Sequence, residues 1–119
     1  MFRRAIEKGC RRLGPSLAIM AAIVLPAAAA HADTVKLSIT IKDQKFDPAE
    51  LHAPAGQAVE IAVKNLNPIV SEFESSDLHF EKIVPAGGQG VVYVRPLQAG
   101  RYNFYDDFHH ATQGYLVVP

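Results

Sequence analysis

Thiols are almost absent from this sequence. Cys10 is the only cysteine in 119 residues, and it precedes an apolar run at residues 17–30. The chain after this run therefore has no disulfide, no thiolate metal ligand and no cysteine nucleophile. A glycine-rich phosphate loop, a G-x-S-x-G elbow and an H-E-x-x-H helix are also absent, so the sequence gives little support to hydrolytic or group-transfer chemistry.

Net charge is absent too, but only as an average over the chain. Twelve Lys+Arg balance twelve Asp+Glu. Residues 1–32 hold five basic groups and one acid, whereas residues 33–119 hold seven basic and eleven acidic groups, a net of −4. A mildly acidic body of this kind argues against nucleic acid as a partner. The length allows one small domain.

Residues 1–32 have the order of parts found in an export signal. Basic residues come first, the apolar run follows, and Ala30-His31-Ala32 supplies a small-x-small site. A membrane-spanning helix needs ~20 apolar residues, and this run is shorter and is interrupted by Pro26. We expect a signal peptide over residues 1–32, cleaved near Ala32 or alternatively after Ala30. The mature chain, residues 33–119, is then exported and does not span the membrane.

Strict alternation of apolar and polar residues marks strands in the mature chain. Residues 35–42 read V-K-L-S-I-T-I-K, and residues 58–64 repeat the pattern. Proline- and glycine-containing turns separate these strands from three further β-rich segments, at residues 91–95, 101–108 and 115–118. No helical period follows residue 32. Six to eight short strands at this spacing predict one all-β domain, an antiparallel Greek-key β-sandwich or small barrel.

Strand parity singles out Asp106. Tyr102, Phe104 and Asp106 share one face of their strand, and the two aromatic residues suit a core. An inward carboxylate is costly unless it is paired, hydrogen-bonded or bound to a metal. Two carboxylates and two imidazoles then lie within five residues: Asp106, Asp107, His109 and His110. These donors suit hard and borderline divalent ions. The alternative is a polar loop whose aspartates cap turns and whose histidines face water.

A second acidic pattern lies in residues 71–75, S-E-F-E-S. In an extended chain, Glu72 and Glu74 share one face and Phe73 takes the other. The two glutamates are either a metal-ligating pair or a solvated face over a buried phenylalanine. His79 and Glu81 follow within ten residues, but nothing in the sequence fixes their direction.

The mature chain resembles the cupredoxins, copper-binding Greek-key β-sandwiches. Tyr102-Asn103-Phe104-Tyr105 leads to Asp106 in the place of the blue-copper cysteine. His109 stands where a histidine ligand belongs, and Glu72 falls where the first histidine would be. The resemblance implies an oxygen-rich site for Cu2+ or for Fe2+/Fe3+, formed by Glu72, Asp106 and His109, and excludes a blue copper centre. Supporting or alternative ligands are Glu74, Asp107, His110, His79 and Glu81.

A narrower resemblance covers most of the mature chain. Residues 42–50 (K-D-Q-K-F-D-P-A-E), 72–75, 81–82 and 108–109 look like the cupredoxin-like domain of bacterial periplasmic iron-uptake systems. This resemblance implies a periplasmic protein. It also implies that its partners are an inner-membrane iron permease and other periplasmic iron-uptake components. It further implies that the protein binds or oxidises ferrous iron, with copper as a candidate cofactor.

Three functions remain open at this point. The first is a metal-binding protein of iron uptake, with electron transfer and ferroxidase-like activity undecided. The second is a non-redox periplasmic metal carrier or chaperone. The third is a metal-free β-sandwich interaction module whose acidic loops only maintain solubility. Catalysed iron oxidation, stoichiometric metal binding without turnover, and no metal binding distinguish the three.

Overall fold

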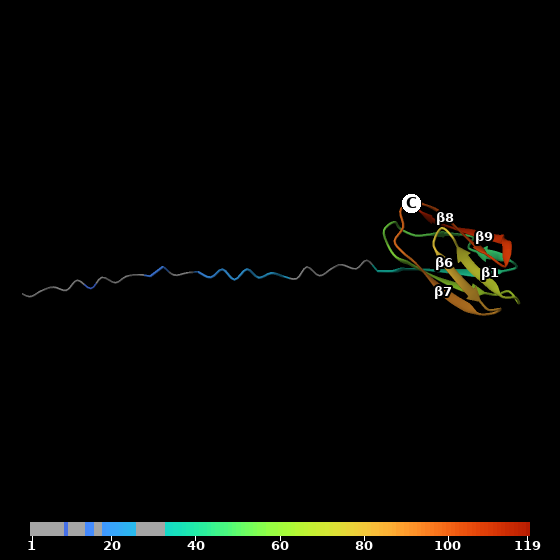
Figure 1. The fold of residues 1–119 in the computed structure, drawn as a ribbon, viewed down its shortest axis with the longest axis horizontal. Helices are drawn as coiled ribbons and strands as arrows, with labels where there is room; N and C mark the ends of the chain where they lie inside the picture. The colour runs from blue at the N-terminus through green and yellow to red at the C-terminus, as the bar shows by residue number, and fades with distance from the viewer. Residues whose placement is uncertain (1–8, 10–13, 16–17, 26–32) are drawn as a thin grey trace, which may run out of the picture.

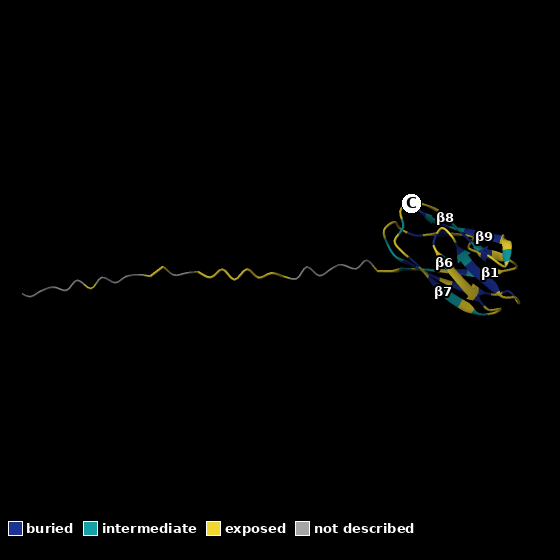
Figure 2. Cartoon of the chain, in the orientation of Figure 1, coloured by how far each residue is buried: buried dark blue, intermediate teal, exposed yellow. Residues whose placement is uncertain are grey.

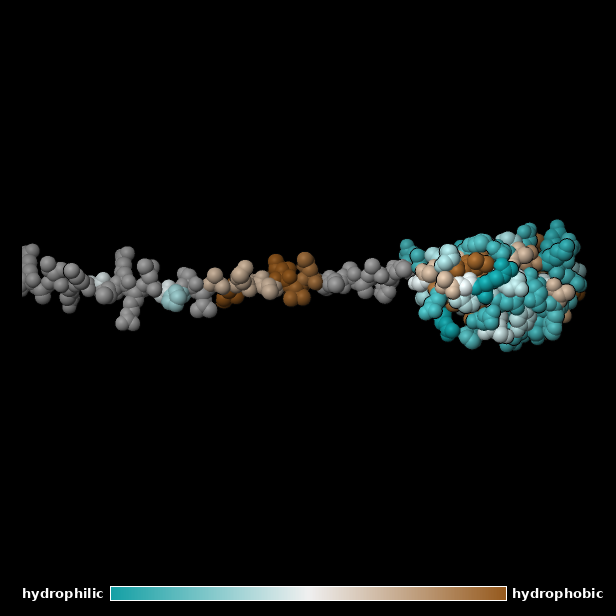
Figure 3. Space-filling model, turned by 90° about the horizontal axis from the view of Figure 1, so that it is seen from above, coloured by the Kyte–Doolittle hydropathy of each residue, from teal (hydrophilic) through white to brown (hydrophobic). Residues whose placement is uncertain are grey.

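The computed structural model describes residues 9, 14–15, 18–25 and 33–119. Most of the predicted signal peptide, including both cleavage points, Cys10 and His31, lies outside the described residues. Residues 18–25 form no helix or strand, and their large apolar side chains, such as Met20 at 93%, are exposed. Figure 3 shows the apolar character of this segment in brown. Among the described residues, no helix has the length and apolar character needed to cross a membrane.

Nine strands make up residues 33–119 (Figure 1). In chain order they are β1 (Val35–Lys42), β2 (Lys45–Asp47), β3 (Glu50–His52), β4 (Val59–Asn65), β5 (Ser71–Ser75), β6 (Phe80–Val84), β7 (Gln89–Val94), β8 (Gly100–Asp106) and β9 (His109–Val118). One sheet has the order β2-β1-β4-β7 and the other has the order β3-β9-β8-β5-β6. The predicted all-β sandwich is confirmed.

Each sheet contains one parallel pair within an otherwise antiparallel arrangement. β1 pairs in parallel with β4, and β3 pairs in parallel with β9. These partners are separated by intervening turns and strands, so the local alternation that predicts each strand carries no information on their mutual direction.

The core lies between the two sheets and follows the alternation seen in the sequence. In the parallel pairing of β1 with β4, Ile39 lies opposite Val63 and Leu37 lies opposite Ile61. Ile39, Ile41, Ile61 and Val63 are each at most 2% exposed. Figure 2 shows where buried residues lie along the strands. Four phenylalanines fill the same interior, with ring centroids 4.7–5.6 Å apart: Phe46, Phe73, Phe80 and Phe104. Rings at these separations add packing energy beyond their burial.

Asn65 fixes the loop that leads into β5. Its side-chain amide donates to the carbonyl oxygens of Ile69 (2.8 Å) and Val84 (3.1 Å), and its Oδ1 accepts from the N–H of Asn67 (3.0 Å). A fully buried amide that makes three hydrogen bonds holds the loop in one conformation. The start of β5 is therefore fixed in space, next to the end of β8.

The end of β8 differs from the sequence prediction. The sequence predicts strands at residues 101–108 and 115–118 with residues 109–114 between them, but β8 ends at Asp106 and β9 begins at His109, so only Asp107 and Phe108 separate the two strands. The side chain of Asp106 accepts a hydrogen bond from the N–H of Phe108 at 3.0 Å, which closes the turn. Aspartate stabilises such turns by bonding to the backbone two residues later.

Candidate metal centre

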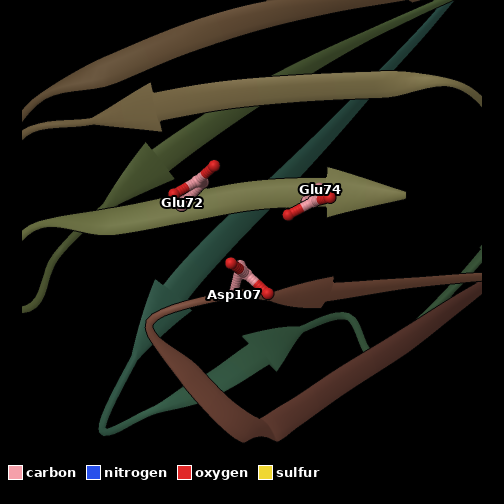
Figure 4. Close-up of side chains that lie close together, drawn as sticks. All are labelled: Glu72, Glu74 and Asp107. Carbon is pink, nitrogen blue, oxygen red and sulfur yellow. The ribbon is translucent and has the colours of Figure 1, made fainter. Parts of the chain in front are cut away.

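Three carboxylates gather on one face of the five-stranded sheet. One oxygen each from Glu72, Glu74 and Asp107 lies within 4.8 Å of the other two (Figure 4). Two ligand atoms on opposite sides of an ion, each ~2.2 Å from it, are ~4.4 Å apart. Small side-chain rotations would therefore let the three carboxylates, hereafter the outer carboxylate group, contact one ion.

Strand alternation and register build the outer carboxylate group. Ser71, Phe73 and Ser75 of β5 are buried in the sandwich, so Glu72 and Glu74 between them project from the outer face. β8 pairs with β5 so that Phe73 faces Asp106, which places Asp107 beside Glu72. The N–H of Asp107 donates to the carbonyl oxygen of Glu72 at 2.9 Å.

A fourth carboxyl, Glu81, comes from β6. It lies directly opposite Glu74 in the β5–β6 pairing, a cross-strand arrangement of like charges that is destabilising by itself. Within residues 33–119, no lysine or arginine lies within ion-pair distance of these four carboxyl groups. In the same part of the chain, the imidazole of His110, with Nε2 3.2 Å from Asp107 Oδ1, is the only basic side chain within ion-pair distance of them.

Glu72 responds to this environment. Its residue surface is 8% exposed. A side-chain hydrogen bond shared with Glu81 is the largest cause that raises the pKa of Glu72, and burial is the next. The charges of the other three carboxylates act in the same direction, and together they raise the pKa of Glu72 from 4.5 to about 7. A strongly shifted acid among like charges is typical of functional sites.

Asp106 and His109 form a separate pair. The Asp106 side chain is 1% exposed, and its Oδ2 lies 3.2 Å from Nδ1 of His109, whose side chain is 25% exposed. Oδ1 accepts hydrogen bonds from the backbone N–H groups of Glu72 (3.1 Å) and Phe108 (3.0 Å). The predicted inward direction of Asp106 agrees with its burial, and the carboxylate is satisfied by hydrogen bonds of the chain.

The structure does not bring Glu72, Asp106 and His109 together as one set of ligands. Asp106 contacts His109, but the carboxylate of Glu72 joins Glu74 and Asp107 instead. The reason is the alternation of side chains along each strand. On β5, Glu72 points to the face away from the buried Phe73, whereas on β8 Asp106 points to the inner face together with Phe104. The sequence already indicates this separation. The alternation around Glu72 and the alternation around Asp106 can both be followed in the sequence, and together they place the two carboxylates on opposite faces.

The supporting residues divide in the same way. Glu74 and Asp107 belong to the outer carboxylate group, with Glu81 and His110 at its margin. His79 lies in the β5–β6 turn with a left-handed φ of 60° and an exposed side chain, near a surface hollow that Glu74 and Glu81 also line. His52 is exposed on β3, 3.2 Å from Glu50 and away from these residues.

The donors present decide which metals fit. Residues 33–119 contain no cysteine, so a thiolate–copper centre does not fit. Three carboxylates with an imidazole at their margin fit hard and borderline divalent cations, and Cu(II) and iron are among these. Glu72, Glu74 and Asp107 are the residues that would hold such an ion.

The two packed sheets, which form an all-β sandwich, define the structural class. A family model for the cupredoxin-like domain matches residues 15–118. The chain therefore belongs to the family of cupredoxin-like domains, as its resemblance predicts. A protein of Rickettsia prowazekii (strain Madrid E), described as uncharacterized, is 38% identical over 85 residues, which cover 71% of this chain and 68% of the relative.

Solved structures agree on the fold. The metal-binding domain of the Cu(I)-exporting P-type ATPase CopA of Streptococcus pneumoniae D39, solved with Cu(I), matches with a TM-score of 0.63 and 17% identity. The match covers 73% of this chain and 96% of that one. Auracyanin A, a "blue" copper protein of Chloroflexus aurantiacus, matches with a TM-score of 0.62 and 20% identity over 73% of this chain and 100% of that one. These neighbours bind copper, and at such identities the likeness shows the fold alone.

Proposed function

We propose that this chain is a periplasmic metal-binding protein of iron uptake that binds Cu(II) or iron through Glu72, Glu74 and Asp107. The observation that carries the proposal is the outer carboxylate group, in which one oxygen of the nine-tenths buried Glu72 lies within 4.8 Å of an oxygen of Glu74 and of an oxygen of Asp107. Carboxylates in this arrangement repel each other, and a bound cation would reverse that cost.

The residues of the chain have distinct tasks in this proposal. Glu72 supplies a preorganised ligand because β5 holds it between two buried residues. Asp107, with 44% of its side chain exposed, opens the site to solvent and to an arriving ion. Ferrous iron is the substrate or cargo, and an inner-membrane iron permease is the proposed recipient. A bound copper ion would supply one-electron redox chemistry.

A non-redox carrier is the second candidate. The exposure of Asp107 and the lack of any thiolate favour it, since an open site of oxygen donors exchanges its ion readily and does not stabilise a reduced copper ion. The two candidates differ in one result. A carrier binds iron stoichiometrically, whereas a ferroxidase speeds the oxidation of ferrous iron over many turnovers.

Metal titration of site variants tests the proposal. Glu72→Gln and Asp107→Asn should each weaken Cu(II) or Fe(II) binding by about 10–100-fold or more. A loss of this size is typical when a group that only hydrogen-bonds to a metal ligand is removed, and the loss of a ligand should cost at least as much. Glu60→Gln, the same chemical change on β4 of the other sheet, should leave the affinity unchanged. Calorimetry gives the affinities, and oxygen consumption with ferrous iron measures turnover. Equal affinities in all three variants would refute the metal site.

A further inference from the structure

Asp106 connects the interior of the sandwich to the backbone of the outer carboxylate group. Its Oδ1 accepts from the N–H of Glu72 at 3.1 Å and from the N–H of Phe108 at 3.0 Å. One of these residues bears an outer carboxylate, and the other directly follows Asp107. A carboxylate that accepts two backbone N–H groups makes strong, charge-assisted hydrogen bonds.

A backbone bond completes the connection. The N–H of Asp107 donates to the carbonyl oxygen of Glu72 at 2.9 Å. Together with the two bonds to Asp106, it fixes β5 against the turn after β8. The β8–β9 pairing is also irregular between Tyr105 and Asp106. The side chain of Asp106 therefore holds the chain in place at the point where the regular hydrogen bonding between β8 and β9 is interrupted.

The acceptor capacity of Asp106 is already engaged. Oδ1 has two backbone donors, and Oδ2 lies 3.2 Å from Nδ1 of His109. The side chain is 1% exposed and lies on the face of the sheet opposite to Glu72 and Glu74. An ion bound by the outer carboxylate group is therefore on the other side of the sheet from the Asp106 carboxylate.

We propose that Asp106 is a positioning residue, which sets the separation of Glu72 and Asp107 by accepting hydrogen bonds from the backbone N–H groups of Glu72 and Phe108, and that it is not itself a metal ligand. This inference rests on the proposed function, since it assigns a role toward the same site. Groups that hold ligands by hydrogen bonds typically contribute about 10–100-fold to metal affinity without touching the ion.

A matched pair of amide substitutions separates positioning from ligation. In Asp106→Asn the side-chain carbonyl oxygen still accepts from both N–H groups, whereas a ligand would lose its charge. We expect Asp106→Asn to keep the Cu(II) affinity of the full protein within about threefold and Glu72→Gln to lose about tenfold or more. In Asp106→Ala the acceptor is gone, and we expect a loss of about tenfold or more although all three outer carboxylates remain.

Hydrogen exchange of two amides gives a readout that needs no metal. The N–H groups of Glu72 and Phe108 should be protected in the wild type and in Asp106→Asn and should exchange faster in Asp106→Ala. An Asp106→Asn variant that loses as much affinity as Glu72→Gln would overturn the positioning role and leave the metal site standing. Wild-type affinity in Asp106→Ala would overturn it as well. A wild-type protein that binds no Cu(II) would refute the proposed function and, with it, any site for Asp106 to position.

Discussion

Glu72 lies on β5 with 8% of its surface exposed, among three other carboxyl groups and without a lysine or arginine partner from residues 33–119. Its pKa of about 7 means that the folded protein binds a proton that the unfolded chain, with an ordinary pKa of 4.5, has already lost. Between these two values the folded state holds more protons, so stability falls as the pH rises. At a pH above the pKa of the folded state, Glu72 is ionised in both states, and its ionisation destabilises the folded state to the full extent.

Glu72→Gln removes this titration. We expect the melting temperature of metal-free wild type to fall, relative to that of Glu72→Gln, between about pH 5 and about pH 8, because only the wild type loses the proton in this window. Thermal unfolding followed by circular dichroism measures the difference, with Glu60→Gln as the control that should follow the wild type. Parallel pH profiles of wild type and Glu72→Gln would contradict the assigned environment.

At the scale of elements, the β8–β9 hairpin carries Asp106, Asp107 and His109 and depends on a close approach at Gly114. A Cβ at this position would overlap the ring of Phe104 and lie 2.9 Å from the carbonyl oxygen of Ala49. Neither group can move freely, because Phe104 is fully buried and the N–H of Tyr115 donates to the carbonyl oxygen of Ala49. A side chain is therefore excluded at position 114, where β9 pairs with β8.

Gly114→Ala should lower the free energy of unfolding by about 1–3 kcal/mol, the usual cost of forcing extra volume into a packed core. Gly90→Ala is the matched control. Its Cβ would meet the flexible side chain of Lys82 at 3.2 Å, and a change of this kind costs within about 0.5 kcal/mol. Chemical denaturation measures both. Equal stabilities would show that β9 can shift away from Phe104.

The sequence predicts the elements well because alternation is a local property. The pattern of residues 35–42 marks β1, and the parities of Glu72, Phe73 and Asp106 are all confirmed. The early start of β9 is not predicted, because the tight turn depends on the Asp106 side chain bonding to Phe108. The predicted ligand set mixes residues from two faces, although the alternation already places Glu72 and Asp106 on opposite faces. That Asp107 lies beside Glu72 could not be predicted, because it depends on the register of Phe73 opposite Asp106, which is a long-range property.

At the scale of the whole molecule, two kinds of asymmetry support export and metal binding. Five basic groups and one acid in residues 1–32 precede a segment with a net charge of −4, as expected for a signal followed by a mature domain. The outer carboxylate group and Glu81 concentrate acidic charge on one face of the five-stranded sheet. A negative surface of this kind attracts divalent cations and raises their local concentration.

In the proposed function, one ion binds on the outer face of the sheet that contains β5 and β8. Crystals of the protein loaded with Cu(II) or Fe(II), measured at the absorption edge of the metal, would locate the ion by its anomalous signal. We expect one peak at ~2.0–2.2 Å from carboxylate oxygens of Glu72, Glu74 and Asp107. A peak coordinated by Asp106 and His109 on the inner side of the sheet, or no peak in the loaded protein, would contradict it.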